Sequence, residues 1–192
     1  IKSLPENIRL EEDNELLEYT GKSENQQEII NQLNTVKGGE YKLRLTDGTF
    51  VQLNSCSEIR YPESFAAGER IVYLSGEAWF DVSPNPECPF YVVTDDVKIR
   101  VYGTEFNVNT FSEGRTTTAL VKGSIGIRGN RDSIYTKITP GWLAVFHKDN
   151  QLLEIRETDL LPYTAWKDGL FVFSGETLES IMDNLSRWYD TE

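Results

Sequence analysis

The chain has 192 residues, 39% hydrophobic and 11% aromatic, which is typical of one folded domain of ordinary size. Its 19 lysines and arginines stand against 31 aspartates and glutamates, a net charge of −12. This balance disfavours nucleic acids and anionic membrane surfaces as partners unless a basic patch exists. The densest basic stretch, Arg128-Gly129-Asn130-Arg131, has the composition of a solvated turn. No apolar run approaches the roughly 20 residues of a membrane span.

The first 36 residues contain few large apolar side chains and show no clear period. The stretch from Ser23 to Leu33 could begin a short helix, with Ser23 as N-cap and Gln26 as the second residue of a capping box, or it could be a linker. Because the chain starts with Ile1 and not with Met, we expect it to be a piece of a longer polypeptide. We therefore interpret residues 1–36 as a linker or peripheral segment.

From Tyr41 onward, apolar residues recur at every second position, which is the period of a half-buried β-strand. Asp47-Gly48 predicts a two-residue hairpin turn, because glycine accepts the positive φ that such turns need, and Asp149-Asn150 is a second hairpin candidate. About ten short strands at steady spacing indicate a mainly β, sandwich- or roll-like domain over residues 37–163. Structural turns or bends are expected at Asp47, Gly48, Gly76, Gly103 and Gly141.

Residues 164–192 follow a different pattern. Leu170 to Phe173 predicts one apolar strand, and the next residues predict an amphipathic helix that faces a core. Asp183 and Arg187 are spaced to pair on that helix. One strand and one helix cannot bury both of their apolar faces alone, so we expect the incomplete start of a small α+β domain. The helical stripe consists of Leu178, Ile181, Met182, Leu185 and Tyr189.

Catalytic groups are scarce in this sequence. The single histidine, His147, precedes a predicted hairpin turn and fits a strand residue better than a catalytic base. Glu77 and Asp81 share one strand face with Trp79 between them. Glycoside hydrolysis needs two carboxylates across a cleft, whereas this spacing fits the outer face of a half-buried strand. We therefore expect no catalytic residue and no enzyme activity.

The sequence also favours the absence of metals and cofactors. Cys56 and Cys88 could form a disulfide in an oxidising compartment, or they could be two thiols. Two cysteines and one histidine without a CxxC spacing do not make a tetrahedral zinc site. The spacing of a calcium loop and the Gly-Lys-Ser/Thr end of a phosphate loop are both missing.

Seven segments follow one another in a specific order between residues 37 and 190. They are Leu45–Asn54, Ser57–Phe65, Arg70–Val82, Pro89–Val92, Val101–Val108, Pro140-Gly141 and the end of the chain from Trp166 to Asp190. In this order and spacing they resemble the FecR family of bacterial periplasmic regulators, most closely in its Bacteroides-type versions. Ile1 to Val36, Cys56 and Cys88 match no part of the family's pattern.

The resemblance implies a role in signalling. FecR-like proteins are anti-sigma factors with a cytoplasmic part that holds an extracytoplasmic-function sigma factor, one transmembrane helix and a periplasmic part. The signalling domain of a TonB-dependent outer-membrane transporter contacts the periplasmic part. The resemblance implies that this chain is that receiving part, tethered to the inner membrane in the full-length protein. It would meet sigma factor only through the missing cytoplasmic part.

The docking surface is open at this point. A partner could add a strand along an exposed sheet edge. Trp188 and Tyr189 could anchor an interface, although they could equally belong to the core of the C-terminal domain. The resemblance assigns no catalytic residue and no cofactor.

Two other classes of function remain open from the residues alone. A carbohydrate-binding β-sandwich would need Trp79, Tyr91 and Tyr102 on one solvent-facing surface with acids beside them. A glycosidase would need a cleft that holds two close carboxylates. A structure can test both alternatives, because each requires a specific arrangement of side chains.

Overall fold

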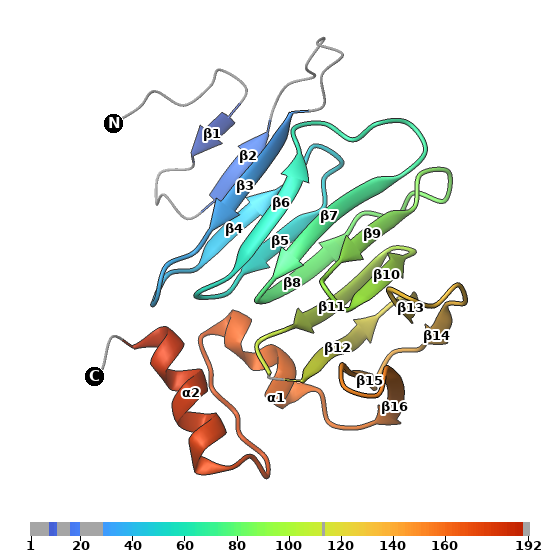
Figure 1. The fold of residues 1–192 in the computed structure, drawn as a ribbon. Helices are drawn as coiled ribbons and strands as arrows, with labels where there is room; N and C mark the ends of the chain where they lie inside the picture. The colour runs from blue at the N-terminus through green and yellow to red at the C-terminus, as the bar shows by residue number, and fades with distance from the viewer. Residues whose placement is uncertain (1–7, 11–15, 20–28, 113, 190–192) are drawn as a thin grey trace.

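The computed structural model describes residues 8–10, 16–19, 29–112 and 114–189, and most of them belong to strands and the turns between them (Figure 1). The strands form two sheets with one shared hydrophobic core. The prediction of a mainly β fold is confirmed, with more strands than the ten expected. Within the described residues, no helix is long and apolar enough to cross a membrane.

The larger sheet has nine strands and is antiparallel except where β2 and β4 run parallel. Its two strands nearest the N-terminus, β1 and β2, come from the segment expected to be a linker. In spatial order the strands are β1 (Ile8–Leu10), β2 (Leu16–Tyr19), β4 (Tyr41–Arg44), β5 (Phe50–Leu53), β8 (Glu77–Val82), β11 (Thr104–Asn109), β12 (Arg115–Lys122), β15 (Trp142–His147) and β16 (Leu152–Glu157).

The smaller sheet has seven strands and contains one parallel pair, β7 and β9. Several of its strands carry polar side chains on the face that points away from the core. In spatial order the strands are β14 (Thr136–Ile138), β13 (Ile125–Gly129), β10 (Val97–Val101), β9 (Phe90–Val93), β7 (Arg70–Ser75), β6 (Glu58–Pro62) and β3 (Ile30–Asn34).

The core lies between the sheets and is built from the alternating residues that the sequence predicts. Phe80 and Phe106 on neighbouring strands stack with ring centroids 5.2 Å apart, and Phe90 of the other sheet meets Phe80 edge-on at 6.5 Å. All three side chains are fully buried. Such aromatic contacts add to the burial of apolar area, the main favourable contribution to folding.

Part of the N-terminal prediction is wrong. The stretch from Ser23 to Leu33, which could have been a short helix or a linker, ends in a strand, because β3 pairs antiparallel with β6 from Ile30↔Pro62 to Asn34↔Glu58. Backbone pairing with β6 overrides the weak helical pattern. Ser23 and Gln26, the proposed cap residues, lie outside the described residues.

The first hairpin turn holds more than the two residues expected. Residues 45–49 connect β4 and β5, with Gly48 at φ +84° and the Leu45 N–H donating to the Thr49 carbonyl. Gly76 has φ +101°, and an added Cβ there would overlap with Ser57, so both its conformation and its contact require glycine. Gly103 and Gly141 also have positive φ, and the chain reverses at Asp149-Asn150 between β15 and β16.

The C-terminal segment contains the only helices among the described residues, and Figure 1 shows them at one end of the molecule, in orange and red. They are α1 (Leu161–Thr164), a 3₁₀ turn η1 (Ala165–Asp168) and α2 (Leu178–Trp188), which Thr177 caps by accepting from the Ser180 N–H. The expected strand Leu170–Phe173 is wrong: this stretch joins no sheet, because no described strand hydrogen-bonds to it.

Candidate functional site

A buried carboxylate marks the surface of the larger sheet on which the C-terminal segment lies. Glu77, the first residue of β8, is only 5% exposed. Its Oε2 accepts from Asn54 Nδ2 and its Oε1 from Asn107 Nδ2, both at 2.8 Å. A buried carboxylate needs such partners, because transfer from water to a protein interior penalises an unpaired charge.

Burial raises the pKa of Glu77 above its ordinary value. Hydrogen bonds from asparagine side chains and the positive charge of Arg187 act in the opposite direction, with smaller effect. Because Arg187 belongs to α2, a residue of the C-terminal segment stabilises the charged form of a carboxylate in the β-domain.

Asn107 carries the network from Glu77 to the C-terminal segment. Its Nδ2 donates to Glu77 while its Oδ1 accepts from Trp166 Nε1 at 3.0 Å. Asn107 is 2% and Trp166 6% exposed, so neither bond competes with bulk water. A buried hydrogen-bonded chain of this kind holds the η1 turn in one position on the sheet.

Lys167, the next residue along η1, adds two contacts. Its backbone carbonyl accepts from Gln52 Nε2 at 3.1 Å, and its ammonium lies 5.3 Å from the centre of the Trp79 ring. Trp79 is only 6% exposed. The interpretation of Glu77 and Trp79 as an outer, solvent-facing strand face is therefore wrong, because the C-terminal segment covers that face; only Asp81 on it is exposed.

The end of α2 is attached to the β-domain at a second place. The guanidinium of Arg187 lies 4.3 Å from the centre of the Phe111 ring, and the Arg187 carbonyl accepts from the Gly38 N–H at 2.9 Å. Gly38 has φ +72°. Arg187 and Asp183 do not form the ion pair that their spacing predicts, since Arg187 turns toward Phe111 and Glu77.

The outward side of the C-terminal segment exposes apolar surface. No residue of α2 is fully buried, and Leu178, Met182 and Tyr189 are 74%, 56% and 55% exposed. Phe171 contacts Trp188 edge-on at 4.9 Å and Tyr189 at 6.2 Å. The helical stripe expected to face a core is thus largely open, and Trp188 and Tyr189 belong to an aromatic cluster at its end.

The geometry argues against both the glycosidase and the sugar-binding module. Glu77 is buried and Asp81 is exposed, so they do not face each other across a cleft. Trp79 lies in the larger sheet, whereas Tyr91 is in β9 of the smaller sheet and Tyr102 directly follows β10 of that sheet. The three aromatic residues therefore do not line one surface, as a sugar-binding module would need.

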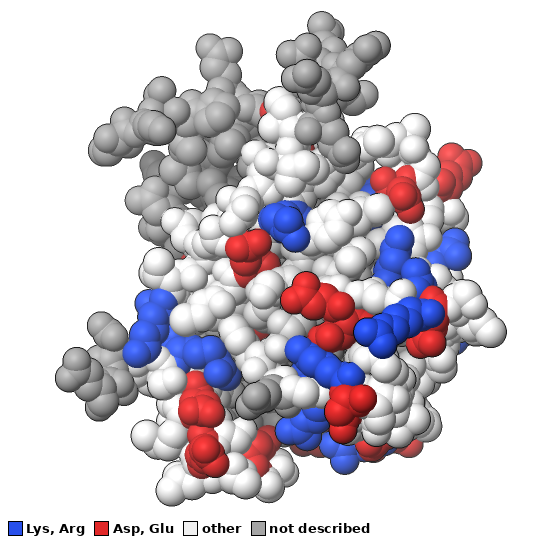
Figure 2. Space-filling view, viewed as in Figure 1, with Lys and Arg blue, Asp and Glu red and all other residues white. Residues whose placement is uncertain are grey.

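The remaining reactive residues are isolated from one another. His147 Nε2 lies 3.5 Å from a Glu154 carboxylate oxygen on the neighbouring strand. Cys56 and Cys88 are free thiols and do not pair. In the part of the chain that the structure describes, no group of three or more His, Cys, Asp or Glu side chains could hold a metal. Figure 2 shows cations and carboxylates interspersed on the face seen there, without a field of one sign.

Sequence reasoning missed the network itself. The segments that carry the family resemblance contain Asn54, Glu77, Asn107 and Trp166, but nothing in the sequence indicates that these four side chains meet. Asn54 does bond locally, since its Oδ1 accepts from the Ser55 N–H at 2.7 Å. Its Nδ2 nevertheless reaches Glu77, 23 residues further along the chain. The one available signal in the sequence was Glu77, a charged residue at the start of a strand whose other residues are mostly apolar.

The fold and the site define a two-sheet β-domain that holds a short helical segment on a buried polar network. The chain belongs to the FecR protein family, whose sequence profile matches residues 31–126. The fold is similar to two crystal structures of a candidate anti-sigma factor from Parabacteroides distasonis ATCC 8503.

Both crystal structures are 26% identical in sequence to this chain, with TM-scores of 0.79 and 0.78. The similarity covers 85% and 84% of this chain and 76% of each neighbour. A comparison with curated proteins gave no match. Family and neighbours together support a role in anti-sigma regulation.

Proposed function

We propose that this chain is the periplasmic, signal-receiving part of a transmembrane anti-sigma factor. In this proposal the signalling domain of a TonB-dependent outer-membrane transporter binds the chain. The signal then passes inward through a transmembrane helix to an extracytoplasmic-function sigma factor. Membership of the FecR family and the similarity to the Parabacteroides structures support the regulatory class.

One structural observation carries the receiving role: the β-domain and the C-terminal segment share a buried hydrogen-bond network. Glu77, Asn107 and Trp166 connect β8, β11 and η1 in one chain of bonds. Leaving a buried donor or acceptor unpaired costs about 1–3 kcal/mol. A partner that displaces the segment therefore alters the β-domain as well, which is what a relay needs.

The outward face of the segment offers the docking surface in this proposal. Met182 and Tyr189 are more than half exposed, and Phe171 packs against Trp188 beside them. Aromatic and methionine side chains are enriched at the centres of protein interfaces. A partner domain that covers them would bury apolar area now in contact with water.

The test measures binding between the purified chain and purified signalling domains from the TonB-dependent transporters of the same genome, by calorimetry. One of these domains is expected to bind. Met182→Ala and Tyr189→Ala are each expected to weaken that binding about tenfold, since each 1.4 kcal/mol lost is a factor of ten. Ile134→Ala, at a side chain 79% exposed and remote from α2 in the sequence, is the control and keeps full affinity.

A second measurement uses the full-length protein in cells, with a reporter for the sigma factor. Deleting the transporter whose domain binds is expected to abolish the response of the reporter to its inducer. If no signalling domain binds and no transporter deletion changes the reporter, the proposal is overturned.

A further inference from the structure

The outward face of the smaller sheet carries two adjacent rows of cationic and tyrosine side chains. Strand pairing places Arg60, Tyr73, Val93, Lys98 and Arg128 side by side across β6, β7, β9, β10 and β13. Four strand spacings of about 4.8 Å make this first row about 19 Å long. We call this surface the Tyr/Arg face.

The second row lies directly beside the first. On β7, β9, β10 and β13, each of its members lies two residues along the strand from a member of the first row, and the row continues onto β14. It combines apolar, aromatic and cationic side chains with one glycine. Its members are Ile71, Tyr91, Arg100, Gly126 and Lys137.

Four cations on the Tyr/Arg face lie over tyrosine rings. Their charged ends are 4.3 to 5.4 Å from the ring centres, within the range of cation–π attraction. Stacking holds a guanidinium flat and leaves its N–H edge available for a carboxylate. The pairs are Arg60–Tyr73, Lys98–Tyr91, Arg100–Tyr102 and Arg128–Tyr135.

Two of these cations have no acidic partner in a strongly acidic protein. Among the described residues, neither Lys98 nor Arg100 forms an ion pair. The Nε of Arg100 is buried without any hydrogen-bond partner. A buried guanidinium N–H that bonds to nothing is costly, and an acceptor that binds there would relieve that cost.

The two rows themselves contain cations and no carboxylate, although the chain as a whole is acidic. They hold the cations Arg60, Lys98, Arg100, Arg128 and Lys137, and the carboxylates Glu58, Glu69 and Asp95 line the hollows beside Arg60 and Tyr73. Arg60 pairs with Glu58 at 3.6 Å, with both side chains well exposed. The chain as a whole carries −12. Lys98 and Arg100, which form no ion pair among the described residues, are therefore complementary to the carboxylates of a partner.

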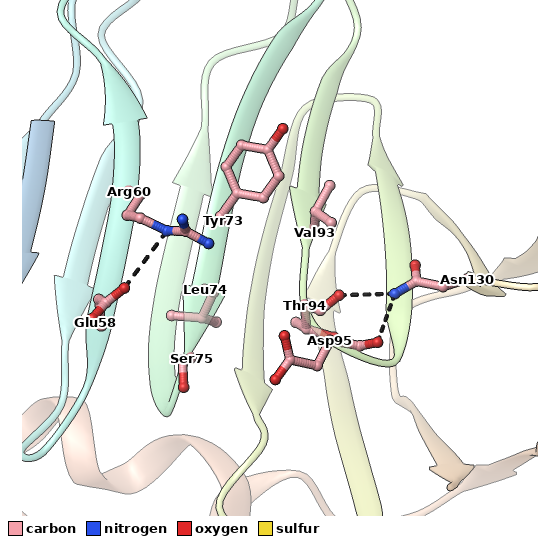
Figure 3. Close-up of a pocket in the computed structure, with 9 residues that line it drawn as sticks. All are labelled: Glu58, Arg60, Tyr73, Leu74, Ser75, Val93, Thr94, Asp95 and Asn130. Atoms are coloured by element: carbon pink, nitrogen blue, oxygen red, sulfur yellow. Dashed lines mark hydrogen bonds and ion pairs between the residues drawn. The ribbon is translucent and has the colours of Figure 1, made fainter. Parts of the chain in front are cut away.

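Two hollows lie at the β6–β7 end of the rows. Figure 3 shows the first, of about 280 Å³, where the Arg60 side chain bonds Glu58 and the Tyr73 ring stands beside it. The second, of about 530 Å³, shares Arg60 and Tyr73 and is also lined by Ile30, Pro62, Phe65, Ala66, Glu69 and Ile71. The first row thus ends at a groove lined by both apolar and charged side chains.

We propose that the Tyr/Arg face binds an acidic polypeptide segment of a partner protein, with carboxylates on Lys98 and Arg100 and an apolar side chain in the Ile30–Phe65–Ile71 groove. A segment of about six extended residues spans the first row at roughly 3.3 Å per residue. This surface is separate from the C-terminal segment, so the inference does not depend on the function proposed above.

Acidic glycans and phosphate groups fit the observations less well. Sugars bind by stacking on open aromatic rings, and here a cation occupies one side of each of the four tyrosine rings. Neither glycans nor phosphates bring an apolar side chain for the groove beside Arg60. A polypeptide supplies carboxylates and apolar side chains together.

The test is an array of decapeptides with Asp or Glu at every second position and all residue types between, probed with the labelled chain. Acidic peptides with a large apolar residue are expected to bind, more weakly at high salt. Lys98→Glu/Arg100→Glu is expected to weaken that binding at least about tenfold for each cation. Lys98→Gln/Arg100→Gln, a milder change, is expected to weaken it in the same sense.

The matched control is Arg115→Glu/Lys122→Glu, the same change of charge at exposed cations of β12 in the other sheet, and it keeps the affinity. Circular dichroism establishes that all variants fold. If no peptide exceeds the signal of the Lys98→Glu/Arg100→Glu variant, the proposal is overturned. It is equally overturned if polygalacturonate or heparin binds through Lys98 and Arg100 more tightly than any peptide.

Discussion

Arg70 and Asp47 form a buried ion pair that joins the two sheets at one edge of the core. Their side chains are 3% and 13% exposed. Asp47 stands in the first hairpin turn of the larger sheet, where it also accepts from the Thr49 N–H at 3.0 Å. Arg70 begins β7 of the smaller sheet and donates to the Cys88 and Ser83 carbonyls at 2.8 and 3.0 Å.

Removing one partner of this pair leaves a buried charge. We expect Asp47→Ala to lower the free energy of unfolding by about 3–5 kcal/mol, because the Arg70 guanidinium then has no counter-charge. Urea unfolding followed by tryptophan fluorescence measures this. Asp81→Ala, at an exposed carboxylate of β8, serves as control and stays within about 0.5 kcal/mol. Equal losses in the two variants would contradict the role of the pair.

Glu77 predicts a dependence of stability on pH. Because burial raises its pKa, the folded protein binds this proton more tightly than the unfolded chain does. The stabilisation from Glu77 is complete below the ordinary value of 4.5 and is lost as the pH rises through the folded pKa. We expect the wild type to lose stability relative to Glu77→Gln as the pH rises above the ordinary value of 4.5.

Unfolding curves at several pH values test this expectation. Glu87→Gln, at an exposed loop carboxylate, is the control and should run parallel to the wild type. A wild type that gains stability relative to Glu77→Gln as the pH rises would have the wrong sign and would exclude desolvation as the dominant effect.

Trp166 couples the C-terminal segment to the network. Trp166→Phe keeps most of the buried ring but removes the N–H that Asn107 Oδ1 accepts, so we expect a loss of about 1–3 kcal/mol. Hydrogen exchange of the α2 amides should become faster, because the segment is held less firmly. Trp142→Phe, at a half-buried tryptophan of β15, should leave α2 exchange unchanged. Unchanged α2 exchange in Trp166→Phe would show that the segment is held by other contacts.

Gly38 tests the second attachment of α2. Gly38 and Gly114 have nearly the same φ, +72° and +74°, so alanine introduces the same backbone strain of about 1–2 kcal/mol at both. An added Cβ at Gly38 would lie 3.0 Å from the Trp188 carbonyl oxygen, whereas at Gly114 nothing lies within 4 Å. We expect Gly38→Ala to be the more destabilising of the two in thermal unfolding. Equal shifts would mean that α2 moves away freely.

Local patterns predicted the inner face of the fold well. The alternation of Ala78, Phe80 and Val82 indicated a strand with one buried side, and all three are buried as expected. The Asp47-Gly48 turn and the amphipathic helix from Leu178 were also predicted, because turn chemistry and helical periodicity depend on neighbours in the sequence.

The errors share one physical cause, contacts between residues distant in the sequence. β3 is a strand because β6 offers it hydrogen bonds, and Leu170–Phe173 is not one because no described strand pairs with it. The far face of β8 is buried because η1 covers Trp79. The Tyr/Arg face could not be seen as a basic patch, since its cations come from four strands and meet only through the register of the sheet.

The sequence by itself determined that the chain folds as a β-domain of the FecR family with an amphipathic C-terminal helix. Periodicity, turn residues and the order of motifs are local properties and are written along the chain. Only the tertiary structure decided that Glu77 is buried, that Asn107 connects it to Trp166, and which cations share a face. These relationships depend on strand register and on the packing of remote segments, which no local pattern of residues specifies.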